Sequence, residues 1–190
     1  MDYIAIGLVI IASLALLAVL WVGFLNTYYL CTILFGVWPP STPTDKKTIS
    51  LSIQEFQKYF DKDKEFVFYD LGCGYGNFIS GFAKAFPKAK IIGVDILYFP
   101  YFFSKFRFRK NKNITIIKDD LYNQNISKAD AVFCFYCGAV KKLSDKLHSE
   151  LPKNCLILSN NFELESLNLI DTIKIKDVFT FRKIFVYKNI

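Results

Sequence analysis

Three alternating glycines follow an acidic residue near the middle of this 190-residue chain, where residues 70–77 read DLGCGYGN. The acidic residue is Asp70, and the glycines are Gly72, Gly74 and Gly76. A glycine-rich turn after a strand lets a ligand approach the main chain, and the helix that follows presents its first amides to that ligand. The dinucleotide fingerprint G-x-G-x-x-G does not fit, because Asn77 and Ile79 stand where its last glycine belongs. The pattern predicts a ligand site, but not one for a nicotinamide dinucleotide.

An acidic strand end followed by G-x-G-x-G resembles motif I of the seven-β-strand S-adenosylmethionine-dependent methyltransferases. Two further carboxylates arrive in the order of that family: Asp95 ends the run IIGVD, and Asp120 lies in KDDLY. The resemblance implies that Asp95 accepts hydrogen bonds from both ribose hydroxyls and that Asp120, rather than Asp119, lies near the adenine amino group. It therefore implies an S-adenosyl-L-methionine site formed by Asp70, Gly72, Gly74, Gly76, Asp95 and Asp120.

A closer resemblance is to the small membrane-anchored protein-lysine methyltransferases, whose mitochondrial members modify the adenine nucleotide translocase and the ATP synthase c subunit, and to their prokaryotic relatives. It rests on an apolar start, the stretch PPSTPT, the glycine motif, the run SKFRFRK at 104–110 and the triplet DLY at 120–122. Two departures stand out. That family usually has an acidic residue where Tyr75 stands and a proline near the position of Gly138.

No catalytic base is identified, which suits a methyl transfer whose acceleration comes from positioning and electrostatics. The acceptor has to be a neutral amine, and desolvation in an aromatic-lined mouth would favour the deprotonated form of a lysine. Tyr136, Asn160 and Asn161 follow the fourth and fifth predicted strands, where open α/β sheets bind ligands. These three residues are the candidates for that mouth, and the alternative is that Tyr136 is a core residue and the asparagines are turn residues.

Strand and helix signals alternate along the rest of the chain, which predicts an α/β fold with a Rossmann-like seven-stranded methyltransferase sheet and helices on both faces. The last two strands, 169–175 and 179–187, should form an antiparallel hairpin. In the aromatic helix at 100–109, the spacing of Phe99, Phe102, Phe103 and Phe106 predicts that these four side chains face the core.

The chain begins with a long apolar segment that has no charged residue between Asp2 and Asp45. As a helix, residues 4–25 would reach roughly 33 Å, which is enough to cross a hydrocarbon core of about 30 Å. The segment is too long and lacks the basic start of a signal peptide, so we expect an uncleaved transmembrane helix. Lys46 and Lys47 follow it, and the positive-inside rule therefore places the rest of the chain on the cytoplasmic or equivalent side.

Three regions follow from these patterns: a membrane anchor at 1–38, a proline-rich linker at 39–47 and a methyltransferase domain at 48–190. The whole chain carries a formal net charge of +7. A basic domain tethered at a bilayer is attracted to anionic headgroups. We find no nucleic-acid-binding motif.

The five cysteines show no disulfide pattern, as expected in a reducing compartment. Cys134 and Cys137 form a C-x-x-C, but they lie in an apolar run with no second pair or histidine cluster. We expect buried strand residues there and no metal site.

Together these features predict a membrane-anchored methyltransferase that acts on lysine side chains of a membrane-associated protein. Two alternatives remain open at this point. One is a methyltransferase for a lipid or quinone-like molecule, and the other is a non-catalytic membrane-tethered adapter that keeps the fold.

Overall fold

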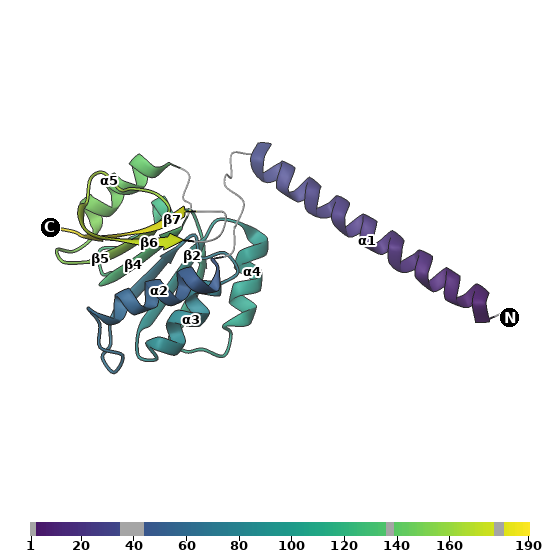
Figure 1. Ribbon diagram of the computed structural model, residues 1–190, viewed down its shortest axis with the longest axis horizontal. Coiled ribbons are helices and arrows are strands. Elements are labelled where there is room, and N and C mark those ends of the chain that lie inside the picture. The colour runs from purple at the N-terminus through teal and green to yellow at the C-terminus, as the bar shows by residue number, and fades with distance from the viewer. Residues whose placement is uncertain (1–2, 35–43, 136–138, 177–180) are drawn as a thin grey trace. The chain divides into compact units, whose positions relative to one another are not determined.

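The computed structural model describes residues 3–34, 44–135, 139–176 and 181–190. The chain divides into two compact units, Met1–Pro40 and Ser41–Ile190. Both are shown in Figure 1.

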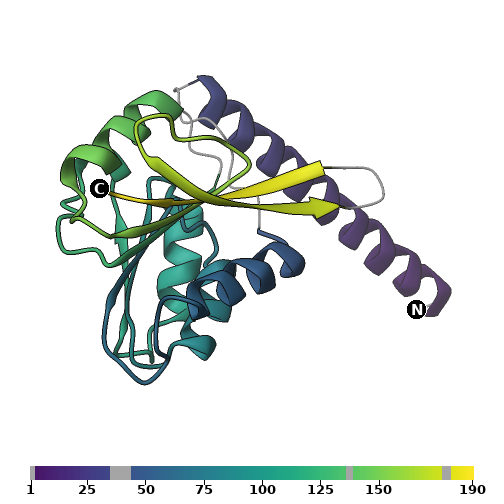
Figure 2. The same ribbon diagram turned by 60° about the vertical axis from the view of Figure 1, so that its left-hand side comes forward.

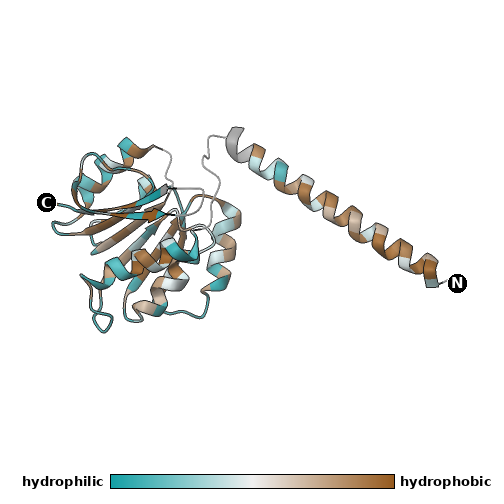
Figure 3. Ribbon diagram, in the orientation of Figure 1, coloured by the Kyte–Doolittle hydropathy of each residue, from teal (hydrophilic) through white to brown (hydrophobic). Residues whose placement is uncertain are grey.

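The first unit contains one long helix, α1 (Tyr3–Leu34). Figure 3 shows that most of α1 is apolar, and its stretch Tyr3–Leu30 is long and apolar enough to cross a membrane, with none of its residues buried. Three polar side chains on α1 donate hydrogen bonds to carbonyls one turn earlier: Ser13 to Val9, Asn26 to Val22 and Thr27 to Gly23. The helix therefore satisfies these polar groups internally.

The second unit is built on a seven-stranded sheet with the strand order β3-β2-β1-β4-β5-β7-β6, which confirms the predicted fold class. The first five strands run parallel, and β7 is antiparallel to both of its neighbours. The strands are β1 (Val67–Leu71), β2 (Lys90–Asp95), β3 (Ile114–Lys118), β4 (Ala131–Phe135), β5 (Leu156–Asn160), β6 (Asn168–Lys176) and β7 (Phe181–Lys188). As predicted, the last two form a hairpin, visible in Figure 2.

Helices cover both faces of the sheet because side chains of successive strand residues point to opposite sides. On one face, Phe68 packs with Phe78 and Phe82 of α3 (Asn77–Ala85) and with Phe56 of α2 (Lys46–Gln57). On the other face, Tyr69 belongs to a cluster with residues of α5 (Val140–Glu150). The members of both clusters lie between residues 49 and 187, so the second unit has a complete core of its own.

The helix α2 was not expected from the sequence. It begins at Lys46, so the last two residues of the predicted linker are helical. Asp45 caps it by accepting hydrogen bonds from the amides of Lys47 and Thr48. The same carboxylate forms an ion pair with Arg182 of β7, which ties the start of the domain to its end.

The aromatic helix α4 (Tyr98–Arg107) presents a different side to the core from the one predicted. The four phenylalanines expected in the core are exposed: Phe99, Phe102, Phe103 and Phe106. The buried positions are Pro100 and Ser104, together with Phe108 just after the helix. The prediction was wrong because β3, against which α4 packs, is the last strand of the sheet, so the contact buries only the side of α4 that carries Pro100 and Ser104. A short 3-10 helix, η1 (Leu121–Asn123), completes the described elements.

Candidate functional site

The predicted cofactor residues lie at one edge of the sheet, where the parallel strands have their carboxyl ends. Asp70 is the second-last residue of β1 and pairs with Gly93 of β2. Asp95 is the final residue of β2. Asn160 is the last residue of β5 and pairs with Phe135 of β4. This edge is where open α/β sheets bind their ligands.

The glycine loop joins β1 to α3 in a conformation that requires glycine. All three predicted glycines have positive φ angles, 82° at Gly72, 53° at Gly74 and 74° at Gly76, a region that other residues rarely adopt. The loop is held to β2 because the amides of Gly72 and Cys73 both donate to the carbonyl of Val94, each at 2.9 Å. Gly76 precedes α3 and provides no capping side chain, so the first amides of that helix remain available to a ligand.

Asp95 connects the loop to the end of β2. Its Oδ2 accepts a hydrogen bond from the Gly74 amide at 2.7 Å, and its Oδ1 accepts one from the Leu97 amide at 2.8 Å. The residue is only 6% exposed, and burial raises the pKa of its carboxyl although the two amide bonds lower it. Each oxygen retains acceptor capacity, so the carboxylate can still accept hydrogen bonds from a diol.

Asp70 is buried without full compensation. It is 2% exposed, and its Oδ2 has no hydrogen-bond partner among the described residues. Burial, and secondarily the charge of Asp95, raise the pKa of Asp70 to about 8. A buried, unsatisfied acidic oxygen is energetically unfavourable by itself but favours a cationic ligand beside it.

The two adjacent aspartates that follow β3 have different hydrogen-bond partners. Asp119 accepts hydrogen bonds from the Asp120 amide and from the side-chain amides of Asn123 and Gln124. Asp120 caps η1 through the Tyr122 amide and is partly exposed. Asp119 is therefore hydrogen-bonded within its own loop, and Asp120 stays the predicted adenine contact.

The two candidate asparagines also differ. Asn160 is fully buried, and neither its Oδ1 nor its Nδ2 has a hydrogen-bond partner among the described residues. Asn161 is exposed, has a positive φ of 73°, and exchanges hydrogen bonds with the backbone of Lys183. Asn161 therefore has the character of a turn residue, whereas Asn160 has an unsatisfied amide at the strand end. Tyr136 lies outside the described residues.

Sequence reasoning missed one residue that holds the loop. Arg107 of α4 donates from Nη1 to the Tyr75 carbonyl at 3.1 Å and to Asn77 Oδ1 at 3.0 Å. The ring of Tyr75, which replaces the acidic residue usual in the family, makes an edge contact with Phe103 at 6.0 Å between centroids. The run SKFRFRK pointed to this region, but nothing in it distinguishes Arg107 from its basic neighbours.

These residues fit S-adenosyl-L-methionine. Buried acceptors at Asp70 and Asp95 suit a ligand that carries an ammonium, a sulfonium and a ribose diol, and the three glycines of the loop add no side chains of their own. The first backbone amides of α3 can donate hydrogen bonds to the carboxylate of the ligand. The unsatisfied Asp70 oxygen supports this fit, because a cationic group of the ligand would compensate the cost of burying it.

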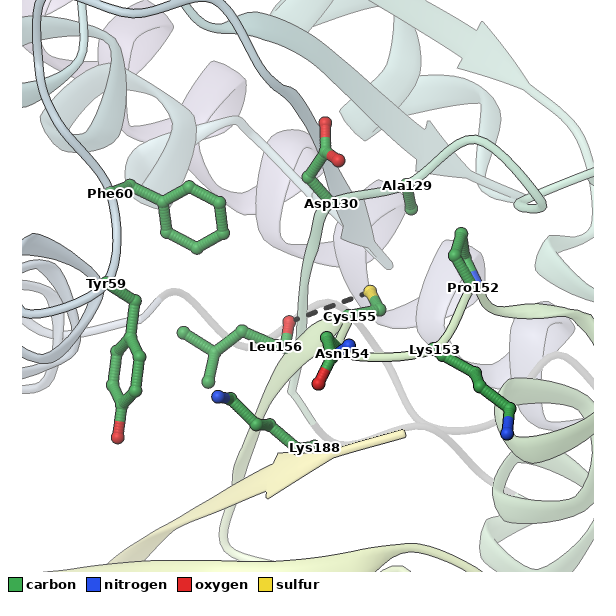
Figure 4. A pocket seen from close by; sticks show the side chains of 10 residues that line it. All are labelled: Tyr59, Phe60, Ala129, Asp130, Pro152, Lys153, Asn154, Cys155, Leu156 and Lys188. Atoms are coloured by element: carbon green, nitrogen blue, oxygen red, sulfur yellow. Dashed lines mark hydrogen bonds between the residues drawn. The ribbon is translucent and has the colours of Figure 1, made fainter. Parts of the chain in front are cut away.

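A separate pocket of about 260 Å³ lies at the opposite edge of the sheet, where β4 and β5 begin (Figure 4). Asp130, Cys155 and Lys188 are among its lining residues. Burial, and secondarily the charge of Asp130, raise the pKa of Cys155 to about 12. The thiol stays protonated at neutral pH, so this pocket offers no activated nucleophile.

Comparison with known proteins agrees with this geometry. Residues 70–170 match the family described as the ANTKMT methyltransferase domain. A protein-lysine N-methyltransferase from Saccharolobus islandicus is 30% identical over 152 residues, which is 78% of this chain and 92% of the relative.

Solved structures share the fold. An RNA methyltransferase from Salinibacter ruber in complex with S-adenosyl-L-homocysteine has a TM-score of 0.67 at 19% identity, covering 78% of this chain and 94% of that one. A S-adenosylmethionine-dependent O-methyltransferase from Thermotoga maritima has a TM-score of 0.64 at 13% identity, covering 81% and 69%. With its glycine loop, its seven-stranded sheet and its family match, the chain belongs to the ANTKMT methyltransferase domain family and is an S-adenosyl-L-methionine-dependent methyltransferase.

Proposed function

We propose that this protein transfers methyl groups to lysine side chains of a protein at a membrane, to which it is anchored by α1. The observation that carries the lysine assignment is the similarity to a protein-lysine N-methyltransferase over 78% of this chain. That similarity spans nearly the whole relative, so it covers the site as well as the scaffold.

The cofactor supplies an electrophilic methyl group on a sulfonium, and the remaining tasks fall to this chain. Asp95 and the glycine loop hold the nucleoside, and ionised Asp70 balances the positive charge of the ligand. Asn160 is the candidate for the acceptor side, because its buried side-chain oxygen can accept a hydrogen bond from the lysine amine and so orient the nitrogen lone pair. Burial around this amide favours the neutral amine.

The membrane assignment rests on α1. Its apolar stretch of 28 residues is about 42 Å long as a helix, so it can cross the hydrocarbon core with some tilt. The side chains of Ser13, Asn26 and Thr27 bond to carbonyls of the same helix, which reduces the penalty of placing these three polar groups in lipid. In this proposal residues 1–38 anchor the chain, a linker follows up to about Lys47, and the methyltransferase domain works on the cytoplasmic or topologically equivalent side.

Calorimetric titration of the full chain in detergent, with S-adenosyl-L-methionine and S-adenosyl-L-homocysteine, tests the site. We expect both to bind, and we expect Gly74→Arg and Asp95→Ala to weaken binding. Losing a hydrogen bond to a charged group costs about 1.5–3 kcal/mol, so Asp95→Ala, which loses the bonds from both ribose hydroxyls, should weaken binding at least roughly tenfold. Unchanged affinity of a folded Asp95→Ala variant would remove the ribose assignment.

The acceptor is tested by incubating the protein and labelled cofactor with membranes, followed by separate analysis of proteins and lipid extracts. Label recovered as methyllysine supports the proposal. Label found in the lipid extract would favour a lipid or quinone-like substrate. Cofactor binding that fails altogether in a folded protein would favour a non-catalytic adapter.

A further inference from the structure

The helix α4 exposes a continuous aromatic face. Its members are Tyr98, Phe102, Phe103 and Phe106, which are 73%, 70%, 58% and 59% exposed. At about 100° per residue these four lie within one side of the helix, and the buried Pro100 and Ser104 lie on the other. Aromatic side chains this exposed are unfavourable in water, so the face is suited to a partner.

Basic residues surround this α4 face. Lys105 and Arg107 flank it on either side along the helix, and Arg109 and Lys110 follow directly. No acidic residue occurs between Asp95 and Asp119, a stretch that also contains Lys112 and Lys118. Several of these cations lie against the aromatic rings, such as Lys118 at 3.7 Å from the Tyr98 centroid and Arg109 at 3.9 Å from that of Phe106.

We propose that the α4 face docks on a lipid bilayer that contains anionic headgroups, with the aromatic rings at the level of the interface and the cations on the phosphates. Aromatic residues interleaved with Lys and Arg on one side of a helix are the pattern of interfacial binding. The occupant is a bilayer rather than a protein because one sign of charge covers the whole stretch and because the same chain contains a helix long enough to cross a membrane.

Docking would orient the methyl-transfer site as well as hold it. Arg107 bonds to the glycine loop at Tyr75 and Asn77, and Phe103 touches the Tyr75 ring. The docked helix would therefore keep the cofactor loop close to the membrane surface. At that distance the methyl-transfer site can reach lysines just outside the bilayer. This consequence rests on the proposed function, whereas docking of the α4 face does not, and it can be measured in a fragment without α1.

The test uses residues 45–190, because both core clusters lie wholly within this part of the chain. Cosedimentation is measured with vesicles of three parts phosphatidylcholine to one part phosphatidylglycerol, and with pure phosphatidylcholine. We expect binding to the anionic vesicles only. The double variant Phe102→Ser/Phe106→Ser should bind at least about tenfold more weakly. Its matched control, Leu169→Ser/Ile190→Ser, changes two other exposed apolar residues and should bind like the wild type.

The charge contribution is tested with Lys105→Gln/Arg109→Gln/Lys110→Gln, which leaves Arg107 in place. At about 1 kcal/mol per basic residue near an anionic surface, this variant should bind roughly a hundredfold more weakly. The control Lys62→Gln/Lys64→Gln/Lys88→Gln removes the same charge from exposed positions elsewhere. If the two triple variants weaken binding equally, the binding reflects only the net positive charge of the domain, and the proposal is overturned.

Insertion is read by fluorescence. Trp21 and Trp38 are the only tryptophans, so the 45–190 fragment contains none and Phe102→Trp introduces a single reporter. We expect a blue shift on anionic vesicles and quenching by brominated lipids, and neither for Leu169→Trp. Fluorescence of Phe102→Trp that brominated lipids do not quench would overturn the proposal. Self-association of the fragment without vesicles, if Phe102→Ser/Phe106→Ser abolishes it, would overturn it in favour of a second copy of this chain as the partner. Cofactor titration of the same fragment keeps a failure to dock separate from a failure of the site.

Discussion

At the scale of single residues, the site is defined by polar groups that the fold buries without fully satisfying them. Asp70 and Asn160 both have side-chain atoms with no hydrogen-bond partner among the described residues. Unsatisfied buried groups are unfavourable for folding, but Ser52, Glu55 and Asn189 also have such atoms away from this site, so position is what distinguishes Asp70 and Asn160. Their position at the carboxyl ends of β1 and β5 places them on the edge where the ligand is expected.

The raised pKa of Asp70 predicts a pH dependence of cofactor binding. Because its pKa is about 8 in the free protein, Asp70 is mostly protonated at pH 6, and binding a cationic ligand beside it must release that proton. We expect the affinity for S-adenosyl-L-methionine to rise by up to about tenfold per pH unit between pH 6 and 8, and to level off above pH 8. Calorimetry across this range measures the slope.

Asp70→Asn is the control, and it should bind with an affinity that hardly changes between pH 6 and 8. The same raised pKa affects folding. The native state holds the proton more tightly than the unfolded chain, so the free energy of unfolding should decrease as the pH rises from about 4 towards 8. A wild-type affinity that is flat over this range would contradict an ionised Asp70 next to the cofactor.

The contrast between the two asparagines gives a second prediction. Asn160→Ala should reduce methyl transfer strongly while leaving the Kd of the cofactor within about twofold, since the amide is proposed to act on the acceptor. Asn161→Gly should retain activity, because glycine accepts the φ of 73°. Single-turnover rates and calorimetric Kd values for both variants make the comparison, and equal losses in rate would refute the separate roles.

At the scale of elements, the glycine loop and α4 depend on each other. Gly76 adopts a φ of 74°, and a Cβ at that position would collide with the ring of Phe108, just after α4. Arg107 fastens the same helix to the loop. The loop conformation therefore requires glycine for two reasons, its backbone angle and the close approach of another element.

Gly76→Ala should lower the free energy of unfolding by about 1–3 kcal/mol and weaken cofactor binding. Adding Phe108→Leu should recover part of the stability, because it relieves the collision but not the strained φ angle. Chemical denaturation of the three proteins measures the effect. A double variant no more stable than Gly76→Ala would show that the Phe108 contact is unimportant.

At the scale of the whole molecule, residues far apart in the chain close the domain. Asp45 begins α2, and its ion pair with Arg182 reaches β7 near the carboxyl end of the chain. Partial burial would raise the pKa of Asp45, but hydrogen bonds from Arg182 and Thr48 outweigh it and hold that pKa well below its usual range. The ionised carboxylate is thus both a helix cap and a bridge.

Asp45→Ala should lower the free energy of unfolding by about 1–2 kcal/mol, since it removes both cap and ion pair. Asp45→Asn keeps a capping group and should lose about 1 kcal/mol or less, because the pair is partly exposed. A carboxylate with a depressed pKa stabilises the fold above about pH 4 and stops doing so as the pH falls further. The difference in stability between the wild type and Asp45→Asn should therefore be smaller at pH 3 than at pH 7, as thermal unfolding at the two pH values would show.

The sequence by itself determined the order of the strands and of the helices between them, though not α2, and it determined the terminal hairpin, the apolar helix α1 and the position of the glycine loop. Each of these is encoded locally, by the spacing of apolar residues or by glycines in one short stretch. The tertiary structure decided which side of α4 is buried, which asparagine is unsatisfied, and that Arg107 and Arg182 bridge separate elements. Those outcomes depend on what lies opposite each residue, as with α4, whose aromatic side is exposed because β3 is the last strand of the sheet.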